Sequence, residues 1–242
     1  MRLIPVPNPA HDGGRVPRSS DEFRRNPSGA GGFTLIELMV VIAIIAILIS
    51  IAVPNLLRSK VAANETAAIG SLRTLLAAEA VIRQMDNDGN AVQDYWTGDV
   101  SGLFRLATAA GGGAQVRLVD IALARADLAP LAAGAAPRPF LTTALAAVPS
   151  DRSGYQFQAM TTDADGNPLQ SDGPDVDANA WENLTRFGIV AVPLVYGNQG
   201  VTTMIIREDG LIYGRDTGNN APVLVWPAAD PATAVPPWRL QN

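Results

Sequence analysis

The pattern of hydrophobic and polar residues divides the chain into a polar start, one long apolar run, an amphipathic continuation and a mixed remainder. The apolar run, residues 33–53, reads FTLIELMVVIAIIAILISIAV and contains a single ionisable side chain, Glu37. At about 1.5 Å per residue, a helix of this length spans roughly 30 Å, the thickness of a bilayer's hydrocarbon core. Because the run is apolar on every face, lipid or other helices must surround it. We therefore predict a membrane-spanning helix.

Residues 54–85 continue with helical spacing of apolar positions. They contain no proline after Pro54, and Gly70 is the only strong helix weakener. The apolar stripe consists of Leu56, Val61, Ile69, Leu72, Leu76, Val81 and Met85, and the charged residues Arg58, Lys60, Glu65, Arg73, Glu79 and Arg83 occupy much of the remaining surface. This pattern predicts an amphipathic helix that packs one face on a soluble domain.

Residues 86–242 are predicted to form a head domain outside the cytoplasm. Strand patterns occur at 155–160, 187–195, 201–207 and 211–214, and a hairpin signal, Gly197-Asn198-Gln199-Gly200, separates the second from the third. Three or four antiparallel strands packed on the long helix give an α+β fold.

The rest of the head gives weaker patterns. Helical spacing appears in 116–128 and in 140–148, so a short helix is expected in each. Trp226 and Trp238 lie in an extended, proline-containing tail. Their side chains are expected to act either as interface anchors or as aromatic lids over a core.

Charge and composition exclude several classes of function. The net charge is −5, and residues 1–32 hold five arginines and three acidic residues, so the remainder carries −7. An acidic body argues against nucleic-acid binding, which needs clustered Lys and Arg. There is no cysteine, and the only histidine is His11. Disulfides and thiol chemistry are excluded, and a chain that loses its first residues has no histidine for a catalytic triad. No pattern indicates an enzyme.

Residues 1–32 are rich in Pro, Gly, Arg and Ser and are predicted to be a leader without regular structure. Arg24 and Arg25 favour a cytoplasmic location for this end, although Arg58 and Lys60 beyond the run weaken the asymmetry. Three interpretations are open: a plain membrane anchor, a secretory signal cut near Ala52, and a precursor cut at the start of the run. The apolar region of a secretory signal normally has about 7–15 residues, fewer than here.

Glu37 lies inside the apolar run, about 6 Å along the helix axis from Phe33. A lone carboxylate at this depth is unfavourable unless it reaches the interface or finds a partner. Cleavage between Gly32 and Phe33 would create an amine one helical turn away. In a packed, water-poor core, such an amine–carboxylate pair would set the axial register between subunits.

The segment Gly31-Gly32-Phe33-Thr34-Leu35-Ile36-Glu37-Leu38-Met39-Val40-Val41 resembles the prepilin peptidase motif of type IV pilins and type II secretion pseudopilins, and the match continues to Pro54-Asn55-Leu56. The resemblance covers about 25 of 242 residues and is specific. It implies that a prepilin peptidase cuts after Gly32 and methylates the amine of Phe33. It also implies that Glu37 pairs with this amine during assembly, and that Pro54 marks a kink or melted stretch of the helix.

The resemblance further implies a structural protein. Copies would form a helical filament, a type IV pilus or a secretion pseudopilus, through their 33–53 helices, and an inner-membrane assembly platform would extract them. Before assembly, each copy would cross the bacterial inner membrane once, with a cytoplasmic N-terminus. The missing disulfide-closed loop tilts slightly towards the pseudopilus. The alternative is a monomeric membrane-anchored envelope protein with a ligand-binding head.

Two acidic loops raise calcium as a ligand. Asp86 and Asp88, and similarly Asp163 and Asp165, alternate with other residues before a glycine, as in some calcium loops. No acidic residue stands at the twelfth position counted from Asp86. A turn made of residues that tolerate left-handed backbone is the favoured interpretation of both, so no cofactor is expected.

Overall fold

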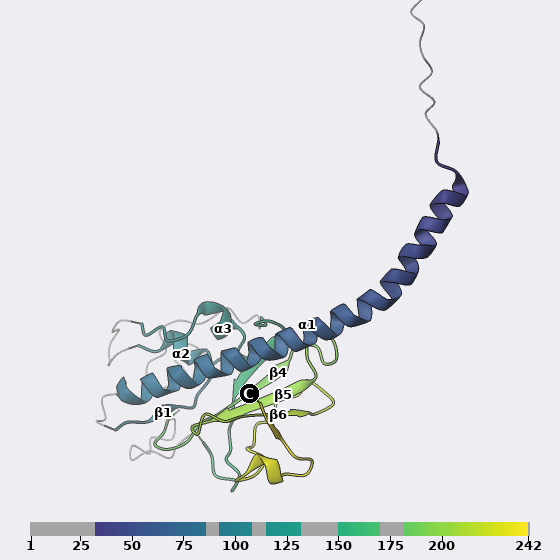
Figure 1. The fold of residues 1–242 in the computed structure, drawn as a ribbon. Helices are drawn as coiled ribbons and strands as arrows, with labels where there is room; N and C mark the ends of the chain where they lie inside the picture. Colours follow the sequence, from purple (N-terminus) through teal and green to yellow (C-terminus); the bar gives the residue numbers. More distant parts are fainter. Residues whose placement is uncertain (1–31, 86–91, 108–114, 132–149, 170–181, 242) are drawn as a thin grey trace, which may run out of the picture. The chain divides into compact units, whose positions relative to one another are not determined.

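A computed structural model describes residues 32–85, 92–107, 115–131, 150–169 and 182–241 (Figure 1). The predictions for the leader up to residue 31, for Asp86 and Asp88, and for a helix in 140–148 lie outside these residues. The chain divides into two compact units, Met1–Leu48 and Ile49–Asn242.

Helix α1 (Leu35–Met85) has 51 residues and includes the whole predicted amphipathic segment, 54–85. Pro54 lies inside it, and the helical backbone continues on both sides of the proline. Of the two forms expected at Pro54, a kink or a melted stretch, α1 shows no melted stretch in this single chain, and the role of Pro54 in assembly stays a prediction. A proline removes one backbone hydrogen bond, and the turns on either side are sufficient to keep the helix continuous.

A five-stranded antiparallel sheet forms the centre of the head, which confirms the α+β fold. Its order is β2 (Tyr155–Ala159), β4 (Gly188–Pro193), β5 (Thr202–Arg207), β6 (Ile212–Asp216) and β7 (Arg239–Leu240). The first four correspond to the predicted strands. The two residues of β7 belong to the tail and pair with Tyr213 and Gly214.

The smaller elements lie in the rest of the head. They are β1 (Tyr95–Trp96), which pairs with β3 (Glu182–Asn183), and the helices α2 (Gly102–Arg105), α3 (Ile121–Arg125) and η1 (Pro231–Thr233). Helix α3 is shorter than the predicted helix in 116–128. The backbone after it bonds to β2 instead, because Phe157 N donates to Ala126 O and Leu128 N donates to Phe157 O, each across 2.8 Å.

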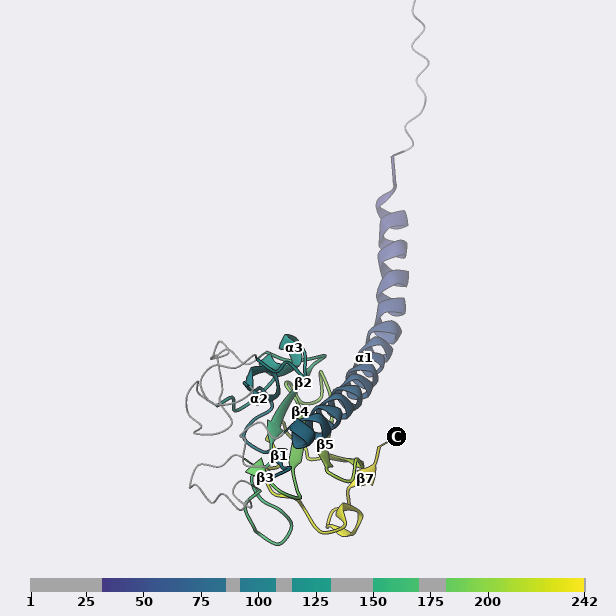
Figure 2. The same ribbon diagram turned by 90° about the vertical axis from the view of Figure 1, so that its left-hand side faces the viewer.

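Two hydrophobic clusters cover the two faces of the sheet. The C-terminal part of α1 lies across one face (Figures 1 and 2), where Leu72 and Leu75 of the helix belong to the same cluster as Phe157 and Met204 of the sheet. On the other face the tail supplies the cover. The buried residues of this second cluster include Val190, Val192, Ile205 and Tyr213 of the sheet and Trp226 and Trp238 of the tail. The interpretation of both tryptophans as lids over a core is therefore confirmed.

The buried face of α1 differs from the predicted stripe. It consists of Ala68, Ser71, Leu72, Leu75, Ala78, Glu79 and Ile82. Leu56, Val81 and Met85 are exposed, whereas Glu79, counted among the charged surface positions, is 1% exposed. Glu79 follows Leu75 by four residues and Leu72 by seven, so helical spacing places it on the same packed face.

Candidate functional site

The predicted cleavage site lies immediately before α1. Gly32 and Phe33 are not helical, and the Phe33 side chain is 88% exposed. A Cβ atom added to Gly32 would meet no atom within 4 Å, and the glycine does not adopt a left-handed backbone. The fold described here therefore gives no reason for a glycine at position 32.

A capping box closes the N-terminus of α1. Glu37 Oε2 accepts hydrogen bonds from Thr34 N and from Thr34 Oγ1, both at 2.8 Å, and Glu37 N donates to Thr34 Oγ1 across 3.2 Å. This reciprocal pattern satisfies backbone donors that the helix itself leaves without partners. A carboxylate in the first turn also interacts favourably with the helix dipole. Thr34 was missed as a site residue, although its T-x-x-E spacing is a sequence signature of a capping box.

The apolar run presents its side chains outward on all sides. Every residue from Gly32 to Lys60 is exposed. Among the described residues, α1 is the one helix that is long and apolar enough to cross a membrane by length and composition. Such a surface is stable only when lipid or other protein covers it, so α1 is suited to membrane anchoring.

The head attaches to α1 from Val61 onwards, where the first partly buried residues of the helix appear. Asn64 Nδ2 donates to Gln199 O across 2.8 Å, and Glu65 Oε1 accepts from Val201 N and Thr202 N, both at 3.1 Å. These contacts fasten the β4–β5 connection to the helix. Glu65, one of the charged residues of the amphipathic pattern, therefore accepts hydrogen bonds from backbone N–H groups of the head.

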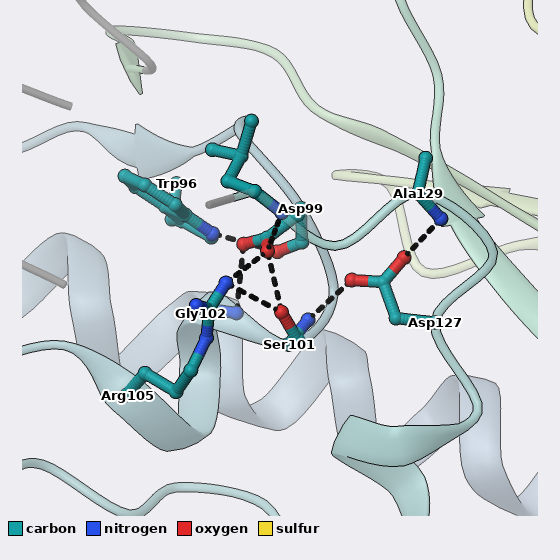
Figure 3. A network of polar contacts seen from close by, with 8 residues as sticks. Trp96, Asp99, Ser101, Gly102, Arg105, Asp127 and Ala129 are labelled. Atoms are coloured by element: carbon teal, nitrogen blue, oxygen red, sulfur yellow. Dashed lines mark hydrogen bonds and ion pairs between the residues drawn. The ribbon is translucent and has the colours of Figure 1, made fainter. Parts of the chain in front are cut away.

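A buried polar network lies between α2 and α3 (Figure 3). Arg105 Nη2 contacts Asp99 Oδ2 at 2.6 Å and Ser101 Oγ at 2.7 Å, and Asp127 Oδ2 accepts from Ser101 N at 2.7 Å. These four residues are at most 3% exposed. Burial, followed by the charge of Asp99, raises the pKa of Asp127 from 3.8 to about 7. Because no substrate can reach these groups, the network is a structural support of the head.

The Asp163 loop is organised by its own aspartate. Asp163 Oδ1 accepts from Asp165 N at 2.9 Å and from Asn167 N at 2.8 Å, while Oδ2 contacts Asn167 Nδ2 and Arg186 Nη1. Burial opposes ionisation, but these donors and the Arg186 charge hold the pKa of Asp163 below its usual value. Among the described residues, no three His, Cys, Asp or Glu side chains form a metal-binding group. The prediction that the two acidic loops are turns and that the chain needs no cofactor stays untested.

The chain matches two protein families over different segments. The prokaryotic N-terminal methylation motif matches residues 27–53, and the family described as "Protein of unknown function (DUF2950)" matches residues 49–228. The first match includes Gly32, Phe33 and Glu37 and ends with the apolar run. The second match covers the head-bearing part of α1 and most of the head.

Two curated relatives are similar to the N-terminal part of the chain. The type IV wide pilus major component PilA4 of Thermus thermophilus is 46% identical over 59 residues, which is 24% of this chain and 44% of the relative. The type IV major pilin protein PilA of Myxococcus xanthus is 45% identical over 56 residues, which is 23% of this chain and 25% of the relative. The chain thus spans less than half the length of either relative. No solved structure matches the chain.

Proposed function

Because this chain belongs to the DUF2950 family of proteins of unknown function and has the N-terminus of the type IV pilin and pseudopilin family, we propose that it is a structural subunit of a type IV pilus-like filament. The observation that carries the proposal is the outward-facing, largely apolar surface of residues 33–53, in which Glu37 is the only ionisable side chain. In the membrane, lipid covers this surface. In a filament, the same segments of neighbouring copies cover it.

The first step of the proposal is cleavage between Gly32 and Phe33 by a prepilin peptidase, followed by methylation of the Phe33 amine. Two observations support it. The peptide bond lies in an exposed, non-helical segment that a protease can bind. The glycine has no steric or conformational role in the fold, so its presence is best explained by the requirements of a processing enzyme.

The second step is pairing of the new amine with Glu37. Thr34 holds the Glu37 carboxylate at the N-terminal end of α1, and Thr34 directly follows Phe33, whose nitrogen becomes the amine after cleavage. Inside a helix bundle with little water, an amine–carboxylate pair is favoured only at the matching axial position. Copies that slide along one another would leave both charges uncompensated. The pair therefore acts as an assembly register, and an inner-membrane platform would extract the subunits.

Both curated relatives are pilus components by name, and this favours a pilus over a secretion pseudopilus. Their likeness is confined to the N-terminal part of this chain. The role of the head, which is the part matched by the DUF2950 family, is therefore a separate question from assembly.

Intact-mass analysis of the membrane-extracted chain tests the processing step. We expect a mature chain that begins at Phe33 and carries one added methyl group. A chain that begins close to Ala52 would identify a secreted protein, and a chain that retains Gly32 would identify a plain anchor; either result contradicts the proposal.

Shearing of cells tests the assembly step. We expect the wild-type chain in the sheared surface fraction and in the membrane. Glu37→Leu and the isosteric Glu37→Gln are expected to resist carbonate extraction from the membrane, as the wild type does, but to be lost from the sheared fraction. Normal filaments from Glu37→Gln would show that the carboxylate does not set the register. A wild-type chain that remains wholly in the membrane fraction would favour a monomeric anchored protein.

A further inference from the structure

A cavity of about 240 Å³ lies in the head, on the side of the sheet covered by the tail. Its lining comes from the Asp163 loop, the residues that open β4, the end of β5 and the tail segment around Trp226. The volume is somewhat smaller than the 300–1,000 Å³ typical of pockets for drug-sized ligands. It suits a molecule of the size of a free amino acid. Neither the apolar surface of α1 nor Glu37 contributes to it.

Arg186 is positioned at the cavity by one nitrogen. Its Nη1 contacts Asp163 Oδ2, and Asp163 is itself fixed by Asp165 N and Asn167 N. The Arg186 side chain remains 47% exposed. None of its other nitrogens has a hydrogen-bond partner among the residues that the structure describes. A guanidinium held in this way presents a planar pair of donors that matches a carboxylate.

Arg207 is positioned in a similar way at the end of the neighbouring strand β5, where it pairs with Gly188 of β4. Its Nε donates to Asp209 Oδ2 across 2.7 Å, and its guanidinium carbon lies 4.9 Å from the ring centroid of Trp226. Within the described part of the chain, its two terminal nitrogens have no acceptor. The indole Nε1 of Trp226 is also buried without an acceptor there. The cavity wall therefore has several N–H donors available to an anionic group.

The same wall carries acidic groups. Asp165 is exposed, and no hydrogen bond to its carboxylate is recorded among the described residues. Glu208 Oε2 accepts one long hydrogen bond, 3.4 Å, from Phe187 N. Asp163 already receives four donors and has little capacity for a ligand. Asp165 and Glu208 are therefore the acceptors available to a cationic group.

We propose that this cavity binds a small zwitterion of the free amino-acid class, with its carboxylate on Arg186 and Arg207 and its ammonium group on Asp165 and Glu208. Leu169 and Phe187 also line the cavity and provide apolar contact for a ligand side chain. Donors and acceptors in one small cavity favour a ligand that carries both charges, because a purely anionic ligand leaves the carboxylates opposed to it.

A sugar ring fits the same cavity less well. Stacking of a sugar needs an open aromatic face, but Trp226 is only 4% exposed and Arg207 covers its ring. A neutral sugar would also leave the guanidinium groups without a charged partner. The charge arrangement therefore selects the zwitterion.

The test uses the full-length chain purified in detergent. Each standard amino acid is screened by thermal shift, and the strongest is titrated by calorimetry beside its amide, which lacks the carboxylate, and its N-acetyl form, which lacks the ammonium group. We expect the parent amino acid to bind and both derivatives to bind about tenfold more weakly or worse, since each loses charge-assisted hydrogen bonds.

Variants locate the site. Arg186→Gln and Glu208→Gln are each expected to weaken binding about tenfold or more. Arg239→Gln removes an exposed arginine on β7, outside the cavity, and is expected to leave the affinity unchanged. A melting curve for each variant confirms that the head is folded.

Three results would overturn the proposal: no binding of any standard amino acid, equal binding of the N-acetyl form, or equal weakening by Arg239→Gln. Equal binding of the N-acetyl form would reveal a simple anion site. These measurements do not depend on whether the chain forms filaments, so this proposal and the proposed function can fail separately.

Discussion

Glu79 of α1 accepts a hydrogen bond from the backbone N–H of Trp96, with 3.0 Å between Trp96 N and Glu79 Oε2. The indole Nε1 of the same tryptophan donates to Asp99 O across 2.6 Å. Trp96 thus joins the long helix to the buried network of Asp99, Ser101, Arg105 and Asp127. Because all these residues are buried, the orientation of the helix on the head depends on polar contacts as well as on apolar packing.

The pH dependence of head stability is expected to follow the buried carboxylates. Burial raises the pKa of Glu79 well above its ordinary value of 4.5, and the pKa of Asp127 is raised to about 7. Between the ordinary and the raised values, the folded state binds more protons than the unfolded chain, so stability falls as pH rises. We expect a higher melting temperature at pH 5 than at pH 8, measured by tryptophan fluorescence.

Glu79→Gln separates the contribution of the charge from that of the hydrogen bond. The amide oxygen can still accept from Trp96 N, and no charge is buried. We expect this variant to be more stable than the wild type at pH 8, with a smaller change between pH 5 and pH 8. Glu79→Leu leaves Trp96 N without an acceptor and should destabilise by about 1–3 kcal/mol at low pH. An unchanged pH profile in Glu79→Gln would show that Glu79 does not titrate in this range.

Arg105→Gln is expected to be strongly destabilising. It removes the cation that faces Asp99 in a site where both side chains are fully buried. Removing one partner of a buried ion pair costs roughly 3–5 kcal/mol. The matched control is Arg152→Gln, which breaks the partly exposed pair with Asp120 and should cost at most about 1 kcal/mol. Denaturant unfolding measures the loss in free energy of unfolding for each variant. Similar losses in the two variants would show that burial does not make the Arg105–Asp99 pair more important to stability than the Arg152–Asp120 pair.

Glu65→Ala is expected to release the β4–β5 connection from α1. The carboxylate accepts from Val201 N and Thr202 N, and a lost charged acceptor costs roughly 1.5–3 kcal/mol. Amide hydrogen exchange at Val201 and Thr202 should become faster, while exchange in β2 stays slow. The neighbouring Thr66→Ala, which removes only a hydroxyl bonded to Ala62 O, serves as control. Unchanged exchange in Glu65→Ala would mean that the hairpin is held by packing alone.

Thr34→Val tests the capping box without changing the charge at Glu37. Loss of an N-cap costs roughly 0.5–2 kcal/mol, and the Glu37 carboxylate loses its hydroxyl partner. We expect faster amide exchange in the first turn of α1 and fewer filaments, whereas Thr34→Ser, which keeps the hydroxyl, should behave like the wild type. Equal filament yield from Thr34→Val and Thr34→Ser would show that the hydroxyl has no role in assembly.

The sequence alone predicted the elements that depend on local pattern. The helical conformation of α1 up to Met85 follows from the apolar run and the periodicity after it, and β2, β4, β5 and β6 follow from alternation and from the hairpin signal. Strand β7 could not be predicted, because its two residues are extended only through pairing with β6. Helix α3 is shorter than the helix predicted in 116–128, because residues 126–128 pair with β2, which is distant in the chain.

The buried charges were beyond prediction from sequence. Glu79 was predicted as a charged surface position, and no sequence pattern singled out Arg105. Burial of a charge depends on partners that are distant in the chain, such as Trp96 for Glu79. The two arginines of the cavity are also distant in the chain, since Arg186 precedes β4 and Arg207 ends β5. By contrast, Gly32, Phe33 and Glu37 form a contiguous motif, and Thr34 completes it with a local hydrogen-bonding pattern that the sequence already contained.

The two edges of the sheet are partly covered or very short. One margin, β2, is covered by the 126–128 backbone, and the other ends in the two-residue strand β7. Exposed strand margins invite unwanted pairing between molecules, and this hazard grows when many copies are held close together. Short or covered edges oppose such pairing, so in the proposed filament we expect neighbouring heads to meet through side-chain surfaces and not through a shared sheet.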